Sequence, residues 1–421
     1  MEKKENTDGM FVQLLRRSEK FFKTDMVYVF KQGLWLSVGQ AFALVSGLAL
    51  SIIFAGVLPK EVYGNYKFVL TIGGLLSGLS LTGLGTVIVQ AVARGAEGTL
   101  GEGVRTHLFW GGIVTSAGIV TALYYYTQGN LQLALGIATA GLSLPIIGAY
   151  SLYGSFLSGR HNFKANTLYW SMGQAINVLV MIVVTLLTHN VFLLVLAYYL
   201  SQALGALALY FMATKRYKPN NVRDESIIHY AKHISVMNLF GTLANQLDKI
   251  LVFHYLGAVE LAVYTFAFAL PEQLKGSFKN LFQIGLPKFA ALSPLQLRKS
   301  ILEKILRLTS YTVILVALYI FFSPFIFKML FPRYLDSVFY SQIYSLGLLA
   351  IPGISLFSTY FQLRQQTRTL YKLNVIGNVA TIILTFLLIK NFGLLGAVIE
   401  NGLSWLILFT INAYYFATDK I

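Results

Sequence analysis

The stretch VFLLVLAYYLSQALGALALYFMA, residues 191–213, carries no charged side chain and is long enough to cross the hydrocarbon core of a bilayer as one α-helix. Eleven further runs of similar length and composition fill most of the 421-residue chain. The twelve predicted spans are residues 33–57, 68–91, 107–127, 131–157, 165–188, 191–213, 233–256, 261–283, 305–330, 338–361, 370–389 and 394–416. The sequence therefore predicts an all-α polytopic membrane protein with its functional site among the helices.

The positive charge of the chain predicts its orientation. The formal net charge is +16, and 25 of the 33 Lys and Arg residues lie in segments that face the cytoplasm if the N-terminus does. Five lie in the opposite segments: Lys60, Lys67, Lys328, Arg333 and Lys390. Because cytoplasmic loops are rich in Lys and Arg, the pattern predicts a multi-pass inner-membrane protein with both termini in the cytoplasm. The charge does not indicate binding of nucleic acid.

Composition argues against several other kinds of site. The chain has no cysteine, which excludes disulfides and thiolate metal sites, and its six histidines lack metal-ligand spacing, so no cofactor or metal is predicted. Residues 1–31 are charged throughout, which argues against a cleavable signal peptide. Their apolar residues recur at helical spacing, which predicts either a cytoplasmic amphipathic helix on the inner leaflet or a lead-in to the first span.

An internal repeat divides the chain. A shift of 198 positions lays the first three spans of one half over those of the other, and a shift of about 205 aligns the last three. The predicted organisation is a six-helix bundle at 32–213, a cytoplasmic linker at 214–232 and a second six-helix bundle at 233–421. Because six is an even number, the bundles share one orientation and are related by a pseudo-twofold axis along the membrane normal. The cleft between them can open alternately to either side.

Charged residues within the predicted spans mark the candidate site, because an ionised side chain in hydrocarbon costs about 2.5 kcal/mol or more. Four polar residues of the eighth span share one helical face: Glu272, Lys275, Lys279 and Gln283. The seventh span carries a second group: Asn245, Asp248 and Lys249. The corresponding positions of the first half are small or neutral. One wall of the cleft is therefore predicted to be charged, with a cationic excess.

That excess favours an anionic cargo, since a phosphate or pyrophosphate gains more from a lysine at low dielectric than in water. The predicted substrate-binding residues are Lys275, Lys249, Lys279, Asn245 and Gln283. In an alternative interpretation, Glu272 with Lys275 and Asp248 with Lys249 only neutralise each other and hold helices together. Lys279 can also extend towards the cytoplasmic face.

Acidic residues of the spans are candidates for binding a proton or sodium ion that drives transport. They are Asp248, Glu272 and Glu400. For Glu400, near the outer end of the last predicted span, a structural role is the favoured interpretation, because a lone carboxylate there can reach water.

Two parts of the chain resemble one transporter family. FAGVLPKEVYGNY at residues 54–66, followed by GLG at 83–85 and QAVARG at 90–95, is similar to the opening of the polysaccharide, or oligosaccharide-lipid, flippases. DKILV at 248–252 and PEQLK at 271–275 are similar to the second half of these proteins. The flippases belong to the multidrug/oligosaccharidyl-lipid/polysaccharide exporter superfamily.

The resemblance implies a V-shaped pair of six-helix bundles that works by alternating access. It implies transfer of undecaprenyl-pyrophosphate-linked oligosaccharide units from the cytoplasmic to the periplasmic leaflet for O-antigen, capsule or exopolysaccharide assembly. The expected partners are this lipid-linked oligosaccharide, membrane lipids and other polysaccharide-assembly proteins. Cationic cavity residues are a theme of the family, which Lys249, Lys275 and Lys279 fit.

Two alternatives stay open. Multidrug members of the superfamily usually place a cation-binding acid in the first bundle, but this chain has no acid between Asp25 and Glu61, so cation-coupled drug efflux ranks second. Lipid II flippases typically carry fourteen spans rather than twelve. A membrane glycan polymerase or ligase would need a sizeable outward loop with acidic and basic residues, and the predicted outward links are short. The protein is therefore not expected to be an enzyme.

Overall fold

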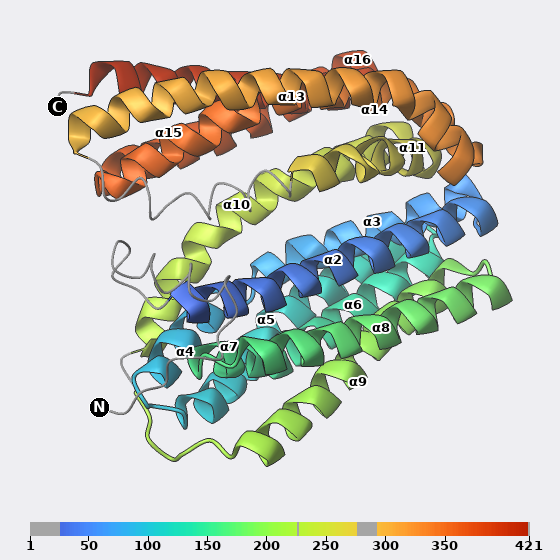
Figure 1. The fold of residues 1–421 in the computed structure, drawn as a ribbon. Helices are drawn as coiled ribbons and strands as arrows, with labels where there is room; N and C mark the ends of the chain where they lie inside the picture. Colours follow the sequence, from blue (N-terminus) through green and yellow to red (C-terminus); the bar gives the residue numbers. More distant parts are fainter. Residues whose placement is uncertain (1–25, 225–226, 276–292, 420–421) are drawn as a thin grey trace, which may run out of the picture.

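The computed structural model describes residues 26–224, 227–275 and 293–419, and every regular element in these ranges is a helix (Figure 1). The helices of the first half are α2 Met26–Val57, α3 Lys60–Gly78, α4 Leu84–Ala93, α5 Thr99–Thr127, α6 Leu131–Tyr150, α7 Leu152–Gly159, α8 Phe163–Leu187 and α9 Val191–Tyr217. Those of the second half are α10 Ile227–Leu256, α11 Ala258–Ala269, α13 Pro294–Leu330, α14 Ser337–Gly347, α15 Ile351–Leu363 and α16 Thr367–Thr418, with the short 3-10 helices η1 Pro332–Tyr334 and η2 Leu348–Ala350.

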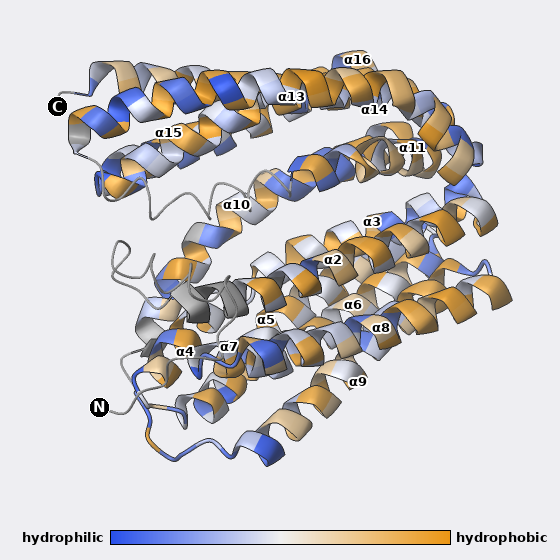
Figure 2. Cartoon of the chain, viewed as in Figure 1, coloured by the Kyte–Doolittle hydropathy of each residue, from blue (hydrophilic) through white to orange (hydrophobic). Residues whose placement is uncertain are grey.

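Eight helical segments of the described ranges are long and apolar enough to cross a membrane. They are Gly33–Val57, Thr99–Thr127, Leu131–Gly159, Phe163–Leu187, Val191–Tyr217, Leu295–Leu330, Ser337–Leu363 and Thr367–Thr418. Figure 2 shows apolar residues along most helices and hydrophilic residues at many helix ends and in the segment between α9 and α10. These features indicate a multi-pass membrane protein.

The eight segments differ from the twelve predicted spans at identifiable places. α16 runs over the last two predicted spans and changes direction at Gly393, whose φ of +56° suits glycine. The second predicted span is divided into α3 and α4, and the eighth is interrupted by a turn at Leu270. These breaks leave shorter continuous helices, so fewer segments are long and apolar enough to be identified as membrane spans. The count of twelve spans stays a prediction.

The two halves of the chain meet where α3 and α4 pack against α10 and α11. Figure 1 shows α2–α9 on one side and α13–α16 on the other, while α3 lies against both α10 and α11. Gly64 of α3 approaches α11 so closely that a Cβ there would overlap the Ala258 carbonyl oxygen. Nearby, the rings of Phe68 and Phe253 stack with their centroids 3.7 Å apart. Close packing at a small residue is how helices associate where lipid supplies no hydrophobic driving force.

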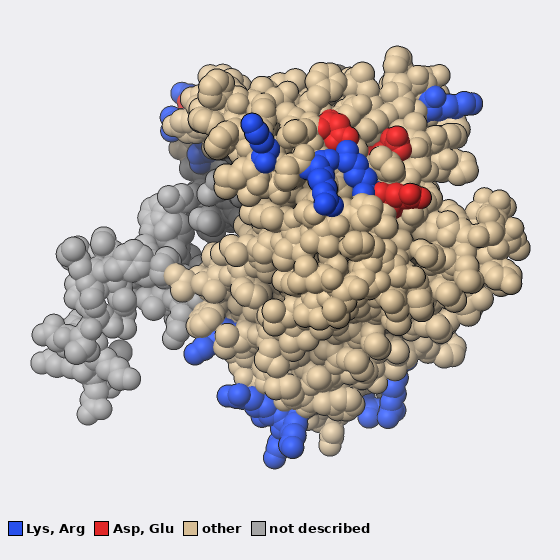
Figure 3. Space-filling view, turned by 90° about the vertical axis from the view of Figure 1, so that its right-hand side faces the viewer, with Lys and Arg blue, Asp and Glu red and all other residues tan. Residues whose placement is uncertain are grey.

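At one end of the molecule, polar contacts join the two halves. Lys60 Nζ lies 2.5 Å from Asp336 Oδ2, and Arg333 Nη1 donates to the Val57 carbonyl at 3.3 Å. Figure 3 looks onto this end and shows Lys or Arg side chains beside Asp or Glu side chains on a largely uncharged face. We call it the closed end, defined by Val57, Lys60, Arg333 and Asp336. The start of α2 and the end of α16 both lie at the opposite end (Figure 1).

The segment that connects the halves is anchored on the first half. Arg160 donates to the two Glu97 carboxylate oxygens at 2.6 and 2.5 Å and to the Tyr217 carbonyl at 2.5 Å. Glu97 also accepts from the backbone N–H of Asn220 at 2.9 Å. The Arg160 hydrogen bonds hold the pKa of Glu97 below its usual value. The pair therefore stays ionised at neutral pH.

The helices extend beyond the predicted segment boundaries. α9 continues to Tyr217 and α10 begins at Ile227, so helix covers both ends of the predicted linker 214–232. α2 begins at Met26, within the predicted amphipathic segment 1–31. Residues 1–25 lie outside the described residues, so the prediction of an amphipathic helix there stays a prediction.

Candidate functional site

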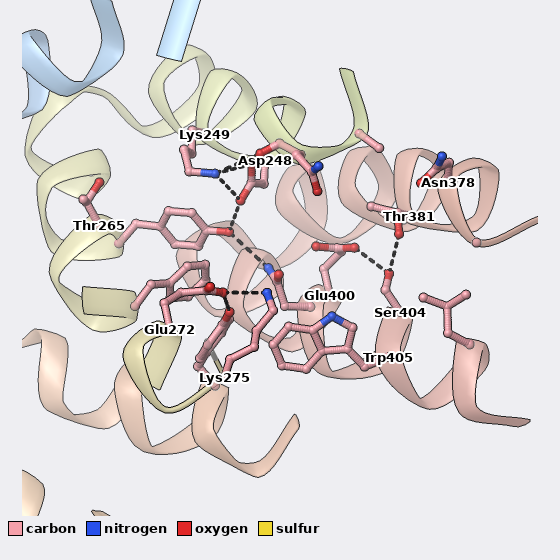
Figure 4. Close-up of a pocket in the computed structure, with 18 of the residues that line it drawn as sticks. Asp248, Lys249, Thr265, Glu272, Lys275, Asn378, Thr381, Glu400, Ser404 and Trp405 are labelled. Carbon is pink, nitrogen blue, oxygen red and sulfur yellow. Dashed lines mark hydrogen bonds and ion pairs between the residues drawn. The ribbon is translucent and has the colours of Figure 1, made fainter. Parts of the chain in front are cut away.

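A cavity of about 470 Å³ lies among the helices of the second half (Figure 4). Its walls come from α10, α11, the helical residues 271–275, α14 and α16. The acidic and basic side chains that line it are Asp248, Lys249, Glu272, Lys275 and Glu400. The fold thus brings into one place charges that lie up to about 150 positions apart in the sequence.

The first ion pair of the cavity belongs to α10. Lys249 Nζ lies 3.2 Å from Asp248 Oδ1 and donates to the Asn245 carbonyl at 3.0 Å. Tyr264 of α11 donates its hydroxyl to Asp248 Oδ2 at 2.7 Å, and the Asn401 amide of α16 donates to the Tyr264 oxygen at 3.2 Å. Asp248 is buried, and a cation and a hydroxyl together offset the cost of burying its charge.

The second ion pair lies just after α11. Lys275 Nζ lies 2.9 Å from Glu272 Oε1, and Tyr344 of α14 donates its hydroxyl to the same carboxylate. The Lys275 ammonium also lies 4.8 Å from the ring centroid of Trp405, within the range of a cation–π contact. The Lys275 and Glu272 side chains are 37% and 43% exposed. A ligand in the cavity can therefore reach both of them.

Glu400 is held differently from the other two acids. It is 2% exposed and accepts a hydrogen bond from Ser404 Oγ at 2.6 Å, and Ser404 in turn accepts from Thr381 at 3.2 Å (Figure 4). The ion pairs among the described residues do not include Glu400. A buried carboxylate without a cationic partner is stable only if it is protonated or binds a cation. The role of Glu400 as a site for a proton or a sodium ion stays a prediction.

The charge of the described lining differs from the predicted cationic excess. It includes two lysines and three acids, and each lysine has a carboxylate within ion-pair distance. Both pairs match the alternative in which the charges neutralise each other. Lys279 and Gln283, predicted on the same face as Lys275, lie outside the described residues. The described part of the lining thus shows no cationic excess. The cationic wall that includes Lys279, and substrate binding by its lysines, stay predictions.

Sequence reasoning missed the neutral groups that hold the acids. Tyr264, Tyr344 and Ser404 supply hydroxyl donors to three different carboxylates. Tyrosine and serine are common in membrane helices, so no local signal distinguished these three. Only the contact between helices identifies them.

Lys67 is also placed differently from the prediction. The prediction assigned it to an outer link, whereas it lies within α3, with its Nζ 5.5 Å from the ring centroid of Tyr63. Helix α3 packs against α10, which carries Lys249. A cation of the first half thus faces the charged helix α10 of the second half.

Comparison with known proteins now decides the family. Residues 29–293 match the family model for polysaccharide biosynthesis proteins. The chain belongs to this family. The match extends over the first half and over the two ion pairs of the cavity, and it confirms the resemblance found in the sequence.

Three solved structures share the fold. The lipid II flippase MurJ in an inward closed conformation superimposes with a TM-score of 0.70 and 13% identity, over 91% of this chain and 87% of MurJ. A multidrug resistance MATE family transporter of the MOP superfamily in an inward-facing conformation superimposes with a TM-score of 0.68 and 17% identity, over 92% of this chain and 98% of the transporter. A MOP superfamily transporter from Pyrococcus furiosus, described by the reverse polarity of its binding pocket, superimposes with a TM-score of 0.62 and 16% identity, over 98% of this chain and 99% of the transporter.

At these identities the likeness establishes the fold alone. No protein of curated function matches this chain by sequence. The family and the fold neighbours are transporters and flippases or take part in polysaccharide biosynthesis, and none of the three structures is described as an enzyme.

Proposed function

We propose that the protein is a flippase that moves polyprenyl-pyrophosphate-linked oligosaccharide units from the cytoplasmic to the outer leaflet of the inner membrane, for O-antigen, capsule or exopolysaccharide assembly. Two six-helix bundles of twelve spans, with both termini cytoplasmic, work by alternating access. The observation that carries the proposal is the cavity, which presents two lysines to a ligand inside a membrane protein of the polysaccharide biosynthesis family. Ammonium groups at low dielectric favour phosphate oxygens as partners.

Capture of the cargo exchanges the partners of both lysines. In the structure Asp248 neutralises Lys249 and Glu272 neutralises Lys275. A diphosphate takes the place of these carboxylates, with Asn245 of the same wall as a further contact. The released Asp248, together with Glu400, then needs another cation, because both acids are buried and an unpaired buried carboxylate is costly. Uptake of a proton or sodium ion meets that need and couples ion binding to transport.

The contacts at the closed end support a direction of entry. The halves are joined there by Lys60 with Asp336 and by Gly64 against Ala258. A cargo therefore enters nearer the opposite end, which the distribution of Lys and Arg assigns to the cytoplasm. Opening of the closed end then releases the oligosaccharide on the outer side.

One observation favours a second candidate function. Three carboxylates line the same cavity, which suits a cationic ligand. The likeness to MATE family transporters gives cation-coupled drug efflux a matching fold. The two candidates differ in the charge of the ligand, so binding measurements separate them.

The test is a thermal-unfolding scan of the purified full chain with farnesyl pyrophosphate and with the cation tetraphenylphosphonium. A ligand that binds the native state raises the melting temperature. The double variant Lys275→Met with Glu272→Gln removes one ion pair without leaving an unpaired buried charge. Lys390→Met, at an exposed lysine of α16, is the matched control.

We expect farnesyl pyrophosphate to stabilise the native chain and the Lys390→Met control, and to stabilise the double variant much less. Stabilisation by tetraphenylphosphonium alone would contradict the flippase and support drug efflux. Equal stabilisation of the native chain and the double variant by farnesyl pyrophosphate would exclude Lys275 as part of the anion site.

A further inference from the structure

The first half of the chain contains a second pocket, of about 110 Å³, that is lined by no Asp, Glu, Lys, Arg or His. It lies between α7, α8 and α9. Its larger polar and aromatic members are Tyr153, Trp170, Gln174, Asn177, Ser201 and Gln202. The volume lies below the ~300 Å³ at which pockets for drug-sized ligands begin. The pocket therefore suits one small, neutral, polar unit.

The internal repeat relates this pocket to the charged cavity. A shift of 204 positions takes three lining residues of α8 to three lining residues of α16: Gly173, Gln174 and Asn177 to Gly377, Asn378 and Thr381. A shift of 203 takes three lining residues of α9 to three others of α16: Ser201, Gln202 and Gly205 to Ser404, Trp405 and Leu408. Both shifts agree with the repeat found in the sequence. The two pockets are therefore the same place in the two halves of the chain.

Several polar groups of this pocket have no partner among the described residues. Asn177 donates to Ser201 Oγ at 2.7 Å and to the Tyr198 carbonyl at 3.2 Å. The Gln174 amide and the Trp170 indole N–H make no such hydrogen bond within the described ranges, and Trp170 is 44% exposed. Polar groups at membrane depth are stable only when water or a ligand meets them. The pocket thus presents an amide and an aromatic ring to a polar ligand.

We propose that this pocket binds a neutral sugar ring of the cargo. The inference rests on the proposed function and divides the cargo between two sites, with the diphosphate in the charged cavity and a sugar here. The apolar face of a pyranose packs against Trp170, while the Gln174 and Gln202 amides exchange hydrogen bonds with its hydroxyls. A phosphate is excluded, because the lining offers it no cation.

Gly205 offers a way to fill the pocket without disturbing its walls. A Cβ built on Gly205 meets no atom within 4 Å, and its repeat equivalent in α16 is Leu408. Gly205→Leu therefore places a leucine where the other half already has one. Gly112→Leu is the matched control, because a Cβ at this exposed position of α5 also meets no atom within 4 Å. Gln174→Leu is a second variant that removes an amide and keeps the volume similar.

The experiment measures binding of two ligands to the full chain in detergent. One is farnesyl pyrophosphate, which has no sugar, and the other is the lipid-linked oligosaccharide extracted from source cells that lack this protein. We expect Gly205→Leu and Gln174→Leu each to weaken binding of the oligosaccharide lipid by about tenfold or more. Binding of farnesyl pyrophosphate stays unchanged in both variants, and Gly112→Leu changes the binding of neither ligand.

Unchanged binding of the oligosaccharide lipid by both variants would overturn the sugar site. Equal weakening of both ligands would also overturn it, because the effect would then not depend on the sugar. Failure of the native chain to bind farnesyl pyrophosphate would count against the proposed function instead, since that ligand does not need the sugar site.

Discussion

Replacing Gly64 by alanine should weaken the contact that joins the two halves at the closed end. A Cβ at this position overlaps the Ala258 carbonyl oxygen and lies 2.5 Å from the Ala258 carbonyl carbon. Carbon atoms in contact keep a distance of about 3.5–4.0 Å, so α3 and α11 must separate by about 1–1.5 Å. Both contacted atoms belong to the backbone, so no side-chain rotation can relieve the overlap.

The cost of this separation sets the expected change in the population of states. Overpacking a close contact costs about 1–3 kcal/mol. A cost of about 2 kcal/mol changes an equilibrium constant about 30-fold. The strain exists only while the halves are joined at the closed end, so Gly64→Ala favours a conformation that is open there. The ion pair of Lys60 and Asp336 cannot offset it, because its side chains are 29% and 49% exposed and such pairs contribute about 0–1 kcal/mol.

Cysteine labelling can measure this opening. The chain has no cysteine of its own, so a single introduced thiol reports without background. Thr265 lines the cavity, and Thr265→Cys should react with a membrane-impermeant maleimide from the outer side only when the closed end opens. We expect Gly64→Ala to raise the labelling rate by up to about 30-fold, in proportion to the open population. Gly56→Ala, where a Cβ meets no atom within 4 Å, is the matched control. Equal labelling rates in the two variants would refute the reasoning.

Three further substitutions test single polar contacts. Arg160 lowers the pKa of Glu97 in the folded chain. Their pairing therefore contributes its full stability at pH values above the ordinary glutamate pKa of about 4.3, and this contribution is lost as the pH falls through the lower pKa of the folded chain. The melting temperature should therefore fall less between pH 7 and pH 3 in Glu97→Gln than in the native chain, and an equal fall in both would contradict this contribution. Tyr264→Phe removes the hydroxyl donor of buried Asp248 and should reduce stability in chemical denaturation by about 1–3 kcal/mol, whereas a native-like midpoint would show that the hydroxyl is dispensable. Glu400→Gln should make transport in proteoliposomes independent of a proton or sodium gradient while farnesyl pyrophosphate still binds; transport that still responds to the gradient would exclude this acid as the coupling site.

Hydropathy predicts where helices cross the membrane but not where they begin. α5 begins at Thr99 and α13 at Pro294, eight and eleven residues before the predicted spans at 107 and 305. Hydropathy marks the stretch that lies in lipid, whereas hydrogen bonding continues the helix through polar turns outside it. For α13 a local signal existed, because Ser293 and Gln296 form a capping box, each side chain bonded to the backbone of the other residue.

The sequence predicts those contacts of the site that join residues close together in the sequence, but not the contacts between distant helices. The spacing of Glu272 and Lys275, three apart on one helical face, predicts their ion pair, and the structure confirms it. The donation from Tyr344 to Glu272 joins residues 72 positions apart. Such a contact depends on how two helices cross, which the periodicity of one sequence does not determine. For the same reason the charge of the described lining differs from the predicted cationic excess, since Glu400 enters the wall from a distant helix.

The difference between the two repeat-related pockets helps to separate the candidate functions. A drug exporter that binds a small cation would use the carboxylates of the charged cavity, and the neutral pocket would add nothing to its transport. A cargo with a charged diphosphate and an uncharged sugar chain needs both kinds of lining. Filling the neutral pocket by Gly205→Leu should therefore leave transport of a cation intact if the protein is a drug exporter and should impair oligosaccharide transfer if it is a flippase. Because the substitution alters no charged residue, its effect on transport depends on whether the cargo carries a sugar.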